Sequence, residues 1–170
     1  MDKANLKDHR QIGQELDLFS FHDVAHGAVF WHNKGWIIYR TLQEFIRGKL
    51  ALQGYQEIST PVLVKNKIFQ QSGHLELFFH NMFNLPIYEE EEINEHLRLI
   101  SQGKIPEDIE VHPINKNKIY YPKPNFSLKP MNCPESTLIY SSHTRSYNDL
   151  PIRFSDFGIL HRRELSGVVG

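Results

Sequence analysis

The sequence predicts an α+β fold with a largely antiparallel sheet. Some segments repeat apolar residues at helical spacing, and others alternate apolar and polar residues as strands do. The two kinds of segment interleave along the chain, with no internal repeat and no glycine-rich loop of the Walker or dinucleotide type. The length of 170 residues, 40% of them hydrophobic, is enough for a globular domain with a core.

The first third of the chain predicts strands followed by a long helix. Residues 16–32 combine short apolar alternation with a glycine-containing bend, which is typical of strands and loops. From about Gly35 the period becomes helical, and the apolar positions are Ile38, Leu42, Phe45, Ile46 and Leu50. Gly54 is placed to end this helix, and residues 55–61 then read as a strand that stops at a proline.

The middle of the chain predicts two helical regions and an irregular stretch. Residues 65–83 favour a helix that runs into residues 71–74, followed by a second short segment. Residues 89–92 are four consecutive glutamates, which suit the solvated N-terminus of a helix that ends before Gly103. Residues 106–125 are rich in proline, asparagine and lysine, and no regular element is predicted there.

The C-terminal region predicts a helix, a turn and a strand. Residues 134–142 suit the helix and residues 147–150 the turn. Residues 152–164 alternate as an extended segment, so Arg162 and Glu164 would project from one face.

Charge and composition narrow the functional classes. A formal net charge of −1 and a pI near 6.8 argue against general attraction to phosphate backbones, so contact with nucleic acid would need a local basic surface. The single cysteine, Cys133, cannot form an intrachain disulfide, which fits a reducing compartment. No secretory signal or membrane-spanning apolar run is present, so we expect a soluble cytoplasmic protein without a membrane partner.

Three groups of residues could carry chemistry, and each has a structural alternative. Arg162 offers a planar fork that suits a phosphate, and Glu164 can accept from an amine, so the pair could bind ATP or form a surface ion pair with Arg163. Cys133 could be a zinc ligand, but no histidine stands at a recognised spacing from it, and a buried core thiol explains it better. His74 could be a general base or a polar loop residue.

Residues 129–134 read Lys-Pro-Met-Asn-Cys-Pro, residues 72–74 Ser-Gly-His and residues 81–83 Asn-Met-Phe. These ordered segments resemble those of threonyl-tRNA synthetases, a family of class II aminoacyl-tRNA synthetases. Residues 146–157 and 161–164 resemble the start of motif 2 of class II synthetases, and residues 54–61 with the helix before them resemble motif 1. The agreement covers about residues 8–85 and 126–170.

The resemblance implies a class II antiparallel sheet flanked by helices, and the activation of threonine with Mg-ATP before transfer to tRNA(Thr). It implies that Arg162 binds the α-phosphate and that Glu164 contacts the adenine amine. By position, Met131 would line the nucleotide or amino-acid pocket, and His74 would accept a proton near the tRNA ribose. The family's motif 1 helices pair across a two-fold axis, so a homodimer through residues 36–52 is also implied.

The resemblance further implies that Cys133 is one of three zinc ligands. Threonine and valine are nearly isosteric, so a site that binds the threonine hydroxyl separates them far better than an apolar pocket does. A zinc ion open to the amino and hydroxyl groups would supply that test.

The chain also departs from the family pattern. Glu135 and Ser136 stand where the family has glycine and histidine, close to the proposed metal, and residues 86–125 look like an insertion without a chemical role. We expect residues 1–170 to be the N-terminal portion of the catalytic domain, without an editing or an anticodon-binding domain. Other zinc ligands and the motif 3 arginine would be missing, so the piece alone would be inactive. The alternatives are a class II synthetase for another amino acid and a non-catalytic binding or dimerisation module.

Overall fold

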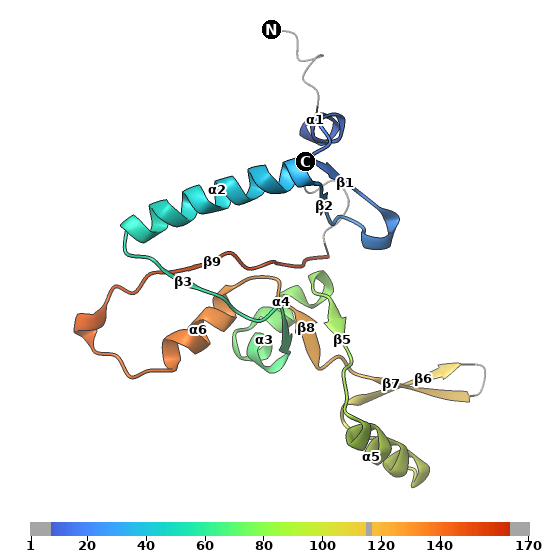
Figure 1. Cartoon of the computed structure of the whole chain (residues 1–170). Helices are drawn as coiled ribbons and strands as arrows, with labels where there is room; N and C mark the ends of the chain where they lie inside the picture. The colour runs from blue at the N-terminus through green and yellow to red at the C-terminus, as the bar shows by residue number, and fades with distance from the viewer. Residues whose placement is uncertain (1–7, 115–116, 164–170) are drawn as a thin grey trace. The chain divides into compact units, whose positions relative to one another are not determined.

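The computed structural model describes residues 8–114 and 117–163 (Figure 1). The chain divides into two compact units, residues 1–56 and residues 57–170.

The first unit holds a long helix and a small strand pair. Its elements are α1 (His9–Glu15), β1 (Phe19–Ser20), η2 (Asp23–Ala25), β2 (Phe30–Trp31) and α2 (Asn33–Leu52). β1 and β2 pair antiparallel, with Phe19 opposite Trp31. The strands within residues 16–32 and the long helix are therefore confirmed, whereas α1 was not predicted because its seven residues carry no clear apolar period.

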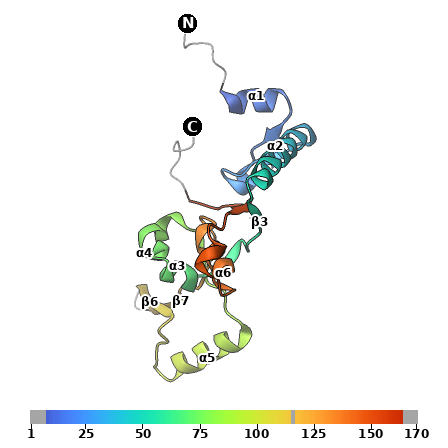
Figure 2. The same cartoon turned by 90° about the vertical axis from the view of Figure 1, so that its left-hand side faces the viewer.

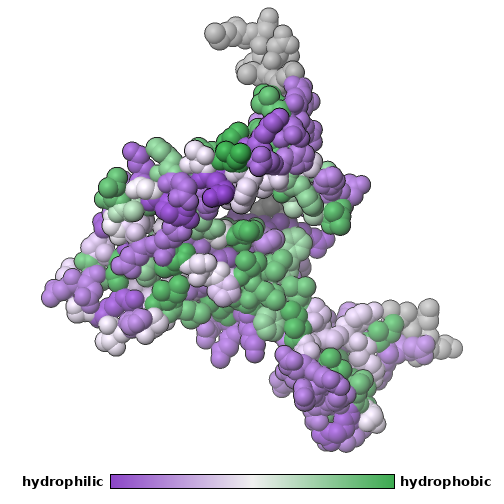
Figure 3. All heavy atoms as spheres, in the orientation of Figure 1, coloured by the Kyte–Doolittle hydropathy of each residue, from purple (hydrophilic) through white to green (hydrophobic). Residues whose placement is uncertain are grey.

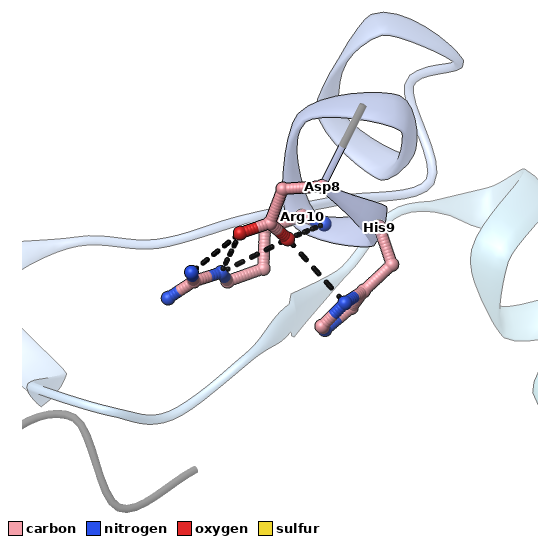
Figure 4. Close-up of polar contacts among 3 residues, drawn as sticks. All are labelled: Asp8, His9 and Arg10. Carbon is pink, nitrogen blue, oxygen red and sulfur yellow. Dashed lines mark hydrogen bonds and ion pairs between the residues drawn. The ribbon is translucent and has the colours of Figure 1, made fainter. Parts of the chain in front are cut away.

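Asp8 caps the N-terminus of α1 (Figure 4). Its carboxylate accepts a hydrogen bond of 2.8 Å from the backbone N–H of Arg10 and further hydrogen bonds from the Arg10 guanidinium. His9 Nδ1 lies 3.3 Å from the same carboxylate. The side-chain hydrogen bond from Arg10 is the main reason why the pKa of Asp8 falls to about 2.

A chain of hydrogen bonds fixes the start of α2 against β1. His32, the residue before α2, bonds through Nδ1 to Asp17 at 2.7 Å and through Nε2 to the Ser20 hydroxyl at 2.9 Å. The backbone N–H of His32 donates to the Leu18 carbonyl at 2.9 Å. The polar side chains of residues 17–32 thus serve the local fold of the first unit.

The second unit contains two small sheets. β3 (Gln56–Ile58) pairs with β9 (Phe154–Asp156), and a three-stranded sheet has the order β4 (Leu63–Lys65), β8 (Phe126–Leu128) and β5 (Asn84–Leu85). β8 runs antiparallel to both of its neighbours, and its central residue, Ser127, pairs with Val64 and Asn84. The Ser127 hydroxyl is fully buried and lies 2.5 Å from Asn66 Oδ1 and 2.6 Å from Asn84 Oδ1.

Short helices complete this unit. They are α3 (Lys67–Gln71), α4 (His74–Phe78), η3 (Phe79–Asn81), α6 (Cys133–Ser141) and η4 (Tyr147–Asp149), several of which are visible in Figure 2. Gly73 separates α3 from α4, since its φ of 74° lies in the left-handed region, and this break falls within residues 71–74, where the predicted helix was expected to end. Phe69 of α3 is fully buried, and Met82, just after η3, is 4% exposed, so both belong to the core.

Residues 86–125 form a helix and a hairpin. α5 (Glu90–Ser101) begins with a capping box between Glu89 and Glu92, which confirms the expected role of the glutamate run. β6 (Ile109–Ile114) pairs antiparallel with β7 (Asn117–Pro122), although this hairpin was not predicted because prolines and lysines obscure its alternation. Tyr88 donates to the Lys123 carbonyl at 2.8 Å, so the segment before α5 is tied to the end of the hairpin.

The fold class is confirmed as mixed helix and antiparallel strand, with one correction. The expected strand at residues 152–164 is limited to β9, and residues 157–163 form no strand. Apolar side chains are widely exposed, as Figure 3 shows by the hydrophobic residues on the visible surface. No helix within the described residues is long and apolar enough to cross a membrane.

We expect the substitution Arg10→Gln to raise the pKa of Asp8 from about 2 toward its ordinary value of 3.8. The stabilisation that a low folded-state pKa gives is present above the unfolded value and is lost as the pH falls through the folded value. The variant should therefore have less of this stabilisation to lose as the pH falls, and an NMR titration of the Asp8 carboxyl carbon would measure the rise in its pKa. His9→Gln is the control, because His9 is the smallest of the stated causes, and an unchanged Asp8 midpoint in Arg10→Gln would contradict this account of the cap.

Candidate functional site

The candidate site forms where the chain leaves β8 and enters α6. The backbone N–H of Lys129 donates to the Val62 carbonyl at 2.8 Å, which continues the antiparallel pairing of β8 beyond its last residue. The Lys129 carbonyl accepts from the backbone N–H of His161 at 3.0 Å. The segment 161–163 is thereby held beside the turn that starts at Lys129.

A pocket of about 330 Å³ opens at this turn and is lined by Phe78, Asn81, Pro130, Met131 and Arg162. The Nε–H group of Arg162 donates to the Pro130 carbonyl at 2.9 Å. Neither terminal guanidinium nitrogen of Arg162 has a hydrogen bond to a residue that the structure describes, so both can donate to a ligand. Arg162 and Met131, which the sequence named as nucleotide-binding candidates, therefore share one pocket.

A buried ion pair lies behind this pocket. Lys129 is fully buried, and its Nζ donates to Thr60 Oγ1 at 2.6 Å and to the Thr60 carbonyl at 3.2 Å. Asp156 Oδ2 lies 3.6 Å from the same ammonium group and accepts from the Thr60 hydroxyl at 2.8 Å. This cluster could not be predicted from the sequence, because lysine is rarely fully buried and no sequence pattern marks the lysines that are.

Gly158 is required by the close packing of this cluster. A Cβ atom at position 158 would lie 2.6 Å from Lys129 Nζ and 3.1 Å from Asp156 Oδ1, and closer still to Asn132 Oδ1. The Asn132 amide donates to the Asp156 carbonyl at 3.3 Å. The backbone of residues 156–158 is thus pressed against the start of α6.

Cys133 is the first residue of α6 and its side chain is exposed. The expectation of a buried core thiol is therefore wrong, because helix packing at this end leaves the thiol side uncovered. Ser136 donates its hydroxyl to the Cys133 carbonyl at 2.9 Å, so this substituted residue stabilises the helix turn. Within residues 8–114 and 117–163 no three histidine, cysteine or acidic side chains are placed to hold a metal ion, so these residues do not fit a complete zinc site.

Glu135, the other departure beside Cys133, points into the protein interior. It is 3% exposed, and neither carboxylate oxygen has a hydrogen-bond partner among the described residues. Burial is the main cause that raises the pKa of Glu135, partly offset by the positive charge of Lys129. The negative charge of Asp156 also raises this pKa.

His74 begins α4, directly after the left-handed Gly73. Its Nδ1 lies 2.8 Å from the Ser72 hydroxyl, and its ring lies 6.0 Å from the ring of Phe78. Phe78 lines the pocket while His74 does not, so the structure places His74 beside the pocket wall. Glu164 lies outside the described residues.

Sequence comparisons relate the whole chain to one group of enzymes. Residues 118–170 match the family described as tRNA synthetase class II core domain (G, H, P, S and T). The chain is 40% identical over 169 residues to a threonine–tRNA ligase of Rickettsia canadensis, covering 99% of this chain. It is 40% identical over 167 residues to that of Rhodospirillum rubrum. The chain spans 21% of the length of each of these relatives.

Solved structures agree with this relation. The chain superposes on the RNA binding domain of threonyl-tRNA synthetase from Cryptosporidium parvum with a TM-score of 0.68 and 30% identity, over 96% of this chain and 33% of that one. It superposes on a Giardia lamblia prolyl-tRNA synthetase in complex with prolyl-adenylate with a TM-score of 0.65, over 93% of this chain and 26% of that one. Identity in the second case is 16%, so that likeness concerns the fold alone.

We expect Gly158→Ala to destabilise the second unit by about 1–3 kcal/mol, because the added methyl group must displace Lys129 or Asn132. Urea unfolding of the chain, followed by circular dichroism, would measure the loss. Gly48→Ala is the matched control, since a Cβ there meets nothing within 4 Å and the residue lies within α2. Equal stability of the natural protein and Gly158→Ala would contradict the packing described for this cluster.

Proposed function

We propose that this chain belongs to the class II tRNA synthetase family and is part of the catalytic domain of a threonine–tRNA ligase. The observation that carries the proposal is the similarity to threonine–tRNA ligases over nearly the whole chain, including segments between the motifs. The proposed enzyme joins threonine to ATP as threonyl-adenylate and then transfers threonine to the 3′ end of tRNA(Thr). Residues 1–170 would form the N-terminal portion of that domain.

Arg162 is proposed to act in the activation step. A carboxylate oxygen of threonine attacks the α-phosphorus of ATP, the bond from that phosphorus to the bridging oxygen breaks, and pyrophosphate leaves. Negative charge grows on the other α-phosphate oxygens as the new bond forms. The terminal nitrogens of Arg162 can donate to those oxygens, while Nε remains bonded to Pro130, so the fork is oriented in advance.

The remaining candidate residues have supporting roles in this proposal. Glu164 would accept a hydrogen bond from the adenine amine, and Met131 would contact the bound nucleotide or amino acid from the pocket wall. His74 would accept the proton of the tRNA ribose hydroxyl as that oxygen attacks the adenylate carbonyl and AMP leaves. The hydrogen bond between His74 Nδ1 and Ser72 would hold the ring in one orientation for this step.

The proposal includes two metal ions, magnesium and zinc, and the described residues support them differently. Mg would accompany ATP as its bound counterion, and no residue is assigned to it. The Cys133 thiol could supply one ligand to zinc, but zinc needs three or four protein ligands, and the described residues place no such set around it. Zinc therefore enters no step of the mechanism proposed here.

A second candidate function is a non-catalytic binding module, favoured by the buried carboxyl group of Glu135 beside Cys133. A synthetase for another amino acid, such as proline, is a third, since the fold is shared with a prolyl-tRNA synthetase. The curated relatives cited above favour threonine over both.

We expect the longest natural form of this protein to catalyse ATP–pyrophosphate exchange that depends on threonine. Arg162→Ala should lower kcat/KM by about 100-fold or more, because it removes a donor to the developing charge. Arg98→Ala is the control, since Arg98 pairs with Glu95 on α5 and lines no part of the pocket. Exchange with a different amino acid would support the third candidate, and the absence of exchange with any amino acid would contradict a catalytic role.

We also propose a homodimer that forms through α2. Leu42 and Phe45 on this helix are each 60% exposed, which is a large apolar area for a protein without a partner. Leu42→Glu should convert a dimer into a monomer, as measured by light scattering during size-exclusion chromatography. Leu97→Glu on α5 is a matched control, because Leu97 is also 60% exposed. A monomeric natural protein at all concentrations would refute this assembly.

A further inference from the structure

Asn81 occupies an unusual place in the candidate site, since it lines the pocket and also bonds to the segment that carries Arg162. Its backbone carbonyl accepts from the backbone N–H of Arg163 at 2.8 Å. Its side-chain amide donates to the Arg163 carbonyl at 3.2 Å. Both polar groups of the Arg163 peptide backbone are thus bonded to one residue.

The segment 161–163 is held on both sides of Arg162. On one side the N–H of His161 bonds to the Lys129 carbonyl, and on the other Arg163 bonds to Asn81. No strand pairing covers residues 157–163, so these few bonds position the segment. Loss of the Asn81 side-chain bond would leave the Arg163 backbone with one hydrogen bond to the residues that the structure describes.

Asn81 is itself placed by the core of the second unit. The Asn84 amide donates to the Phe79 carbonyl at 2.9 Å, at the start of η3, and the Asn84 side-chain oxygen lies against the buried Ser127 hydroxyl. Met82, the next residue after Asn81, is buried. A rigid part of the sheet therefore sets the position from which Asn81 reaches Arg163.

We propose that Asn81 is a positioning residue that holds Arg162 in the orientation needed to bind a nucleotide phosphate. The hydrogen bond from the Arg162 Nε–H group to the Pro130 carbonyl depends on the position of the Arg162 backbone. That position is set by the backbone hydrogen bonds of the neighbouring residues His161 and Arg163. Asn81 acts through Arg162, and its own side chain need not contact the nucleotide. The identity of the ligand as a nucleotide phosphate rests on the proposed function. The hydrogen bonds between Asn81 and Arg163 do not depend on that function.

The first test needs no activity. In the natural protein, NMR should show slow solvent exchange of the Arg162 Nε–H proton, because it is bonded to Pro130. Asn81→Ala should speed this exchange about fivefold, the effect expected from losing one hydrogen bond. Asn81→Leu, which keeps about the same size but lacks the donor and adds no charge, should behave like alanine, and Asn94→Ala on the exposed face of α5 should change nothing. Unchanged exchange in Asn81→Ala would overturn the proposal.

The second test is a double-mutant cycle that combines Asn81→Ala with Arg162→Ala in the longest natural form of the protein. One readout is ATP binding, measured by equilibrium dialysis, and the other is the KM for ATP in threonine-dependent ATP–pyrophosphate exchange. Asn81→Ala should weaken ATP binding about fivefold with little change in the KM for threonine. It should have no further effect when Arg162 is already alanine. An equal effect in both backgrounds would mean that Asn81 contacts ATP directly, which overturns the positioning role. If the natural protein binds ATP but shows no exchange with threonine, the proposed function fails, and the dialysis cycle still decides the role of Asn81.

Discussion

The buried contact between Lys129 and Asp156 is the interaction on which the candidate site depends. It joins the turn after β8, the loop before β4 that carries Thr60, and the end of β9. A buried ammonium group is costly unless its hydrogen bonds and its charge are both satisfied, and here Thr60 and Asp156 supply them. Because the same turn continues into Pro130 and Met131, the ion pair also fixes the pocket wall. The arrangement explains why a glycine stands at position 158.

Much of the fold could be predicted because its elements follow local rules. The apolar period of α2 and the glutamates at the start of α5 express helix geometry and helix capping, which depend on neighbouring residues. The end of α3 near residues 71–74 was also predicted, and the left-handed conformation of Gly73 accounts for it. The hairpin of β6 and β7 was not predicted, because prolines and lysines obscure the alternation of its strands.

The candidate site, like the fold, could be predicted from the sequence only in part. Arg162 and Met131 were identified from motif order and lie in one pocket, whereas the partners that orient Arg162 could not be read from the sequence. Pro130 contributes a backbone carbonyl, and Asn81 is 82 residues away from the peptide it holds. Backbone acceptors and long-range amide bonds leave no pattern in a single sequence. Burial is equally hidden, because the exposed thiol of Cys133 and the buried carboxyl group of Glu135 lie in the same first turn of α6.

The Lys129 cluster also has a consequence for the order of events during synthesis. Thr60 and Lys129 are 69 residues apart, and Asp156 follows 27 residues later, so the ammonium group acquires its counter-charge only after most of this chain has left the ribosome. Contacts between residues so distant in sequence form late, because the entropy of closing a long loop opposes them. Until then, the nascent chain carries an uncompensated lysine that favours water over the interior. We therefore expect the pocket beside Pro130 and Met131 to be among the last parts of the second unit to form.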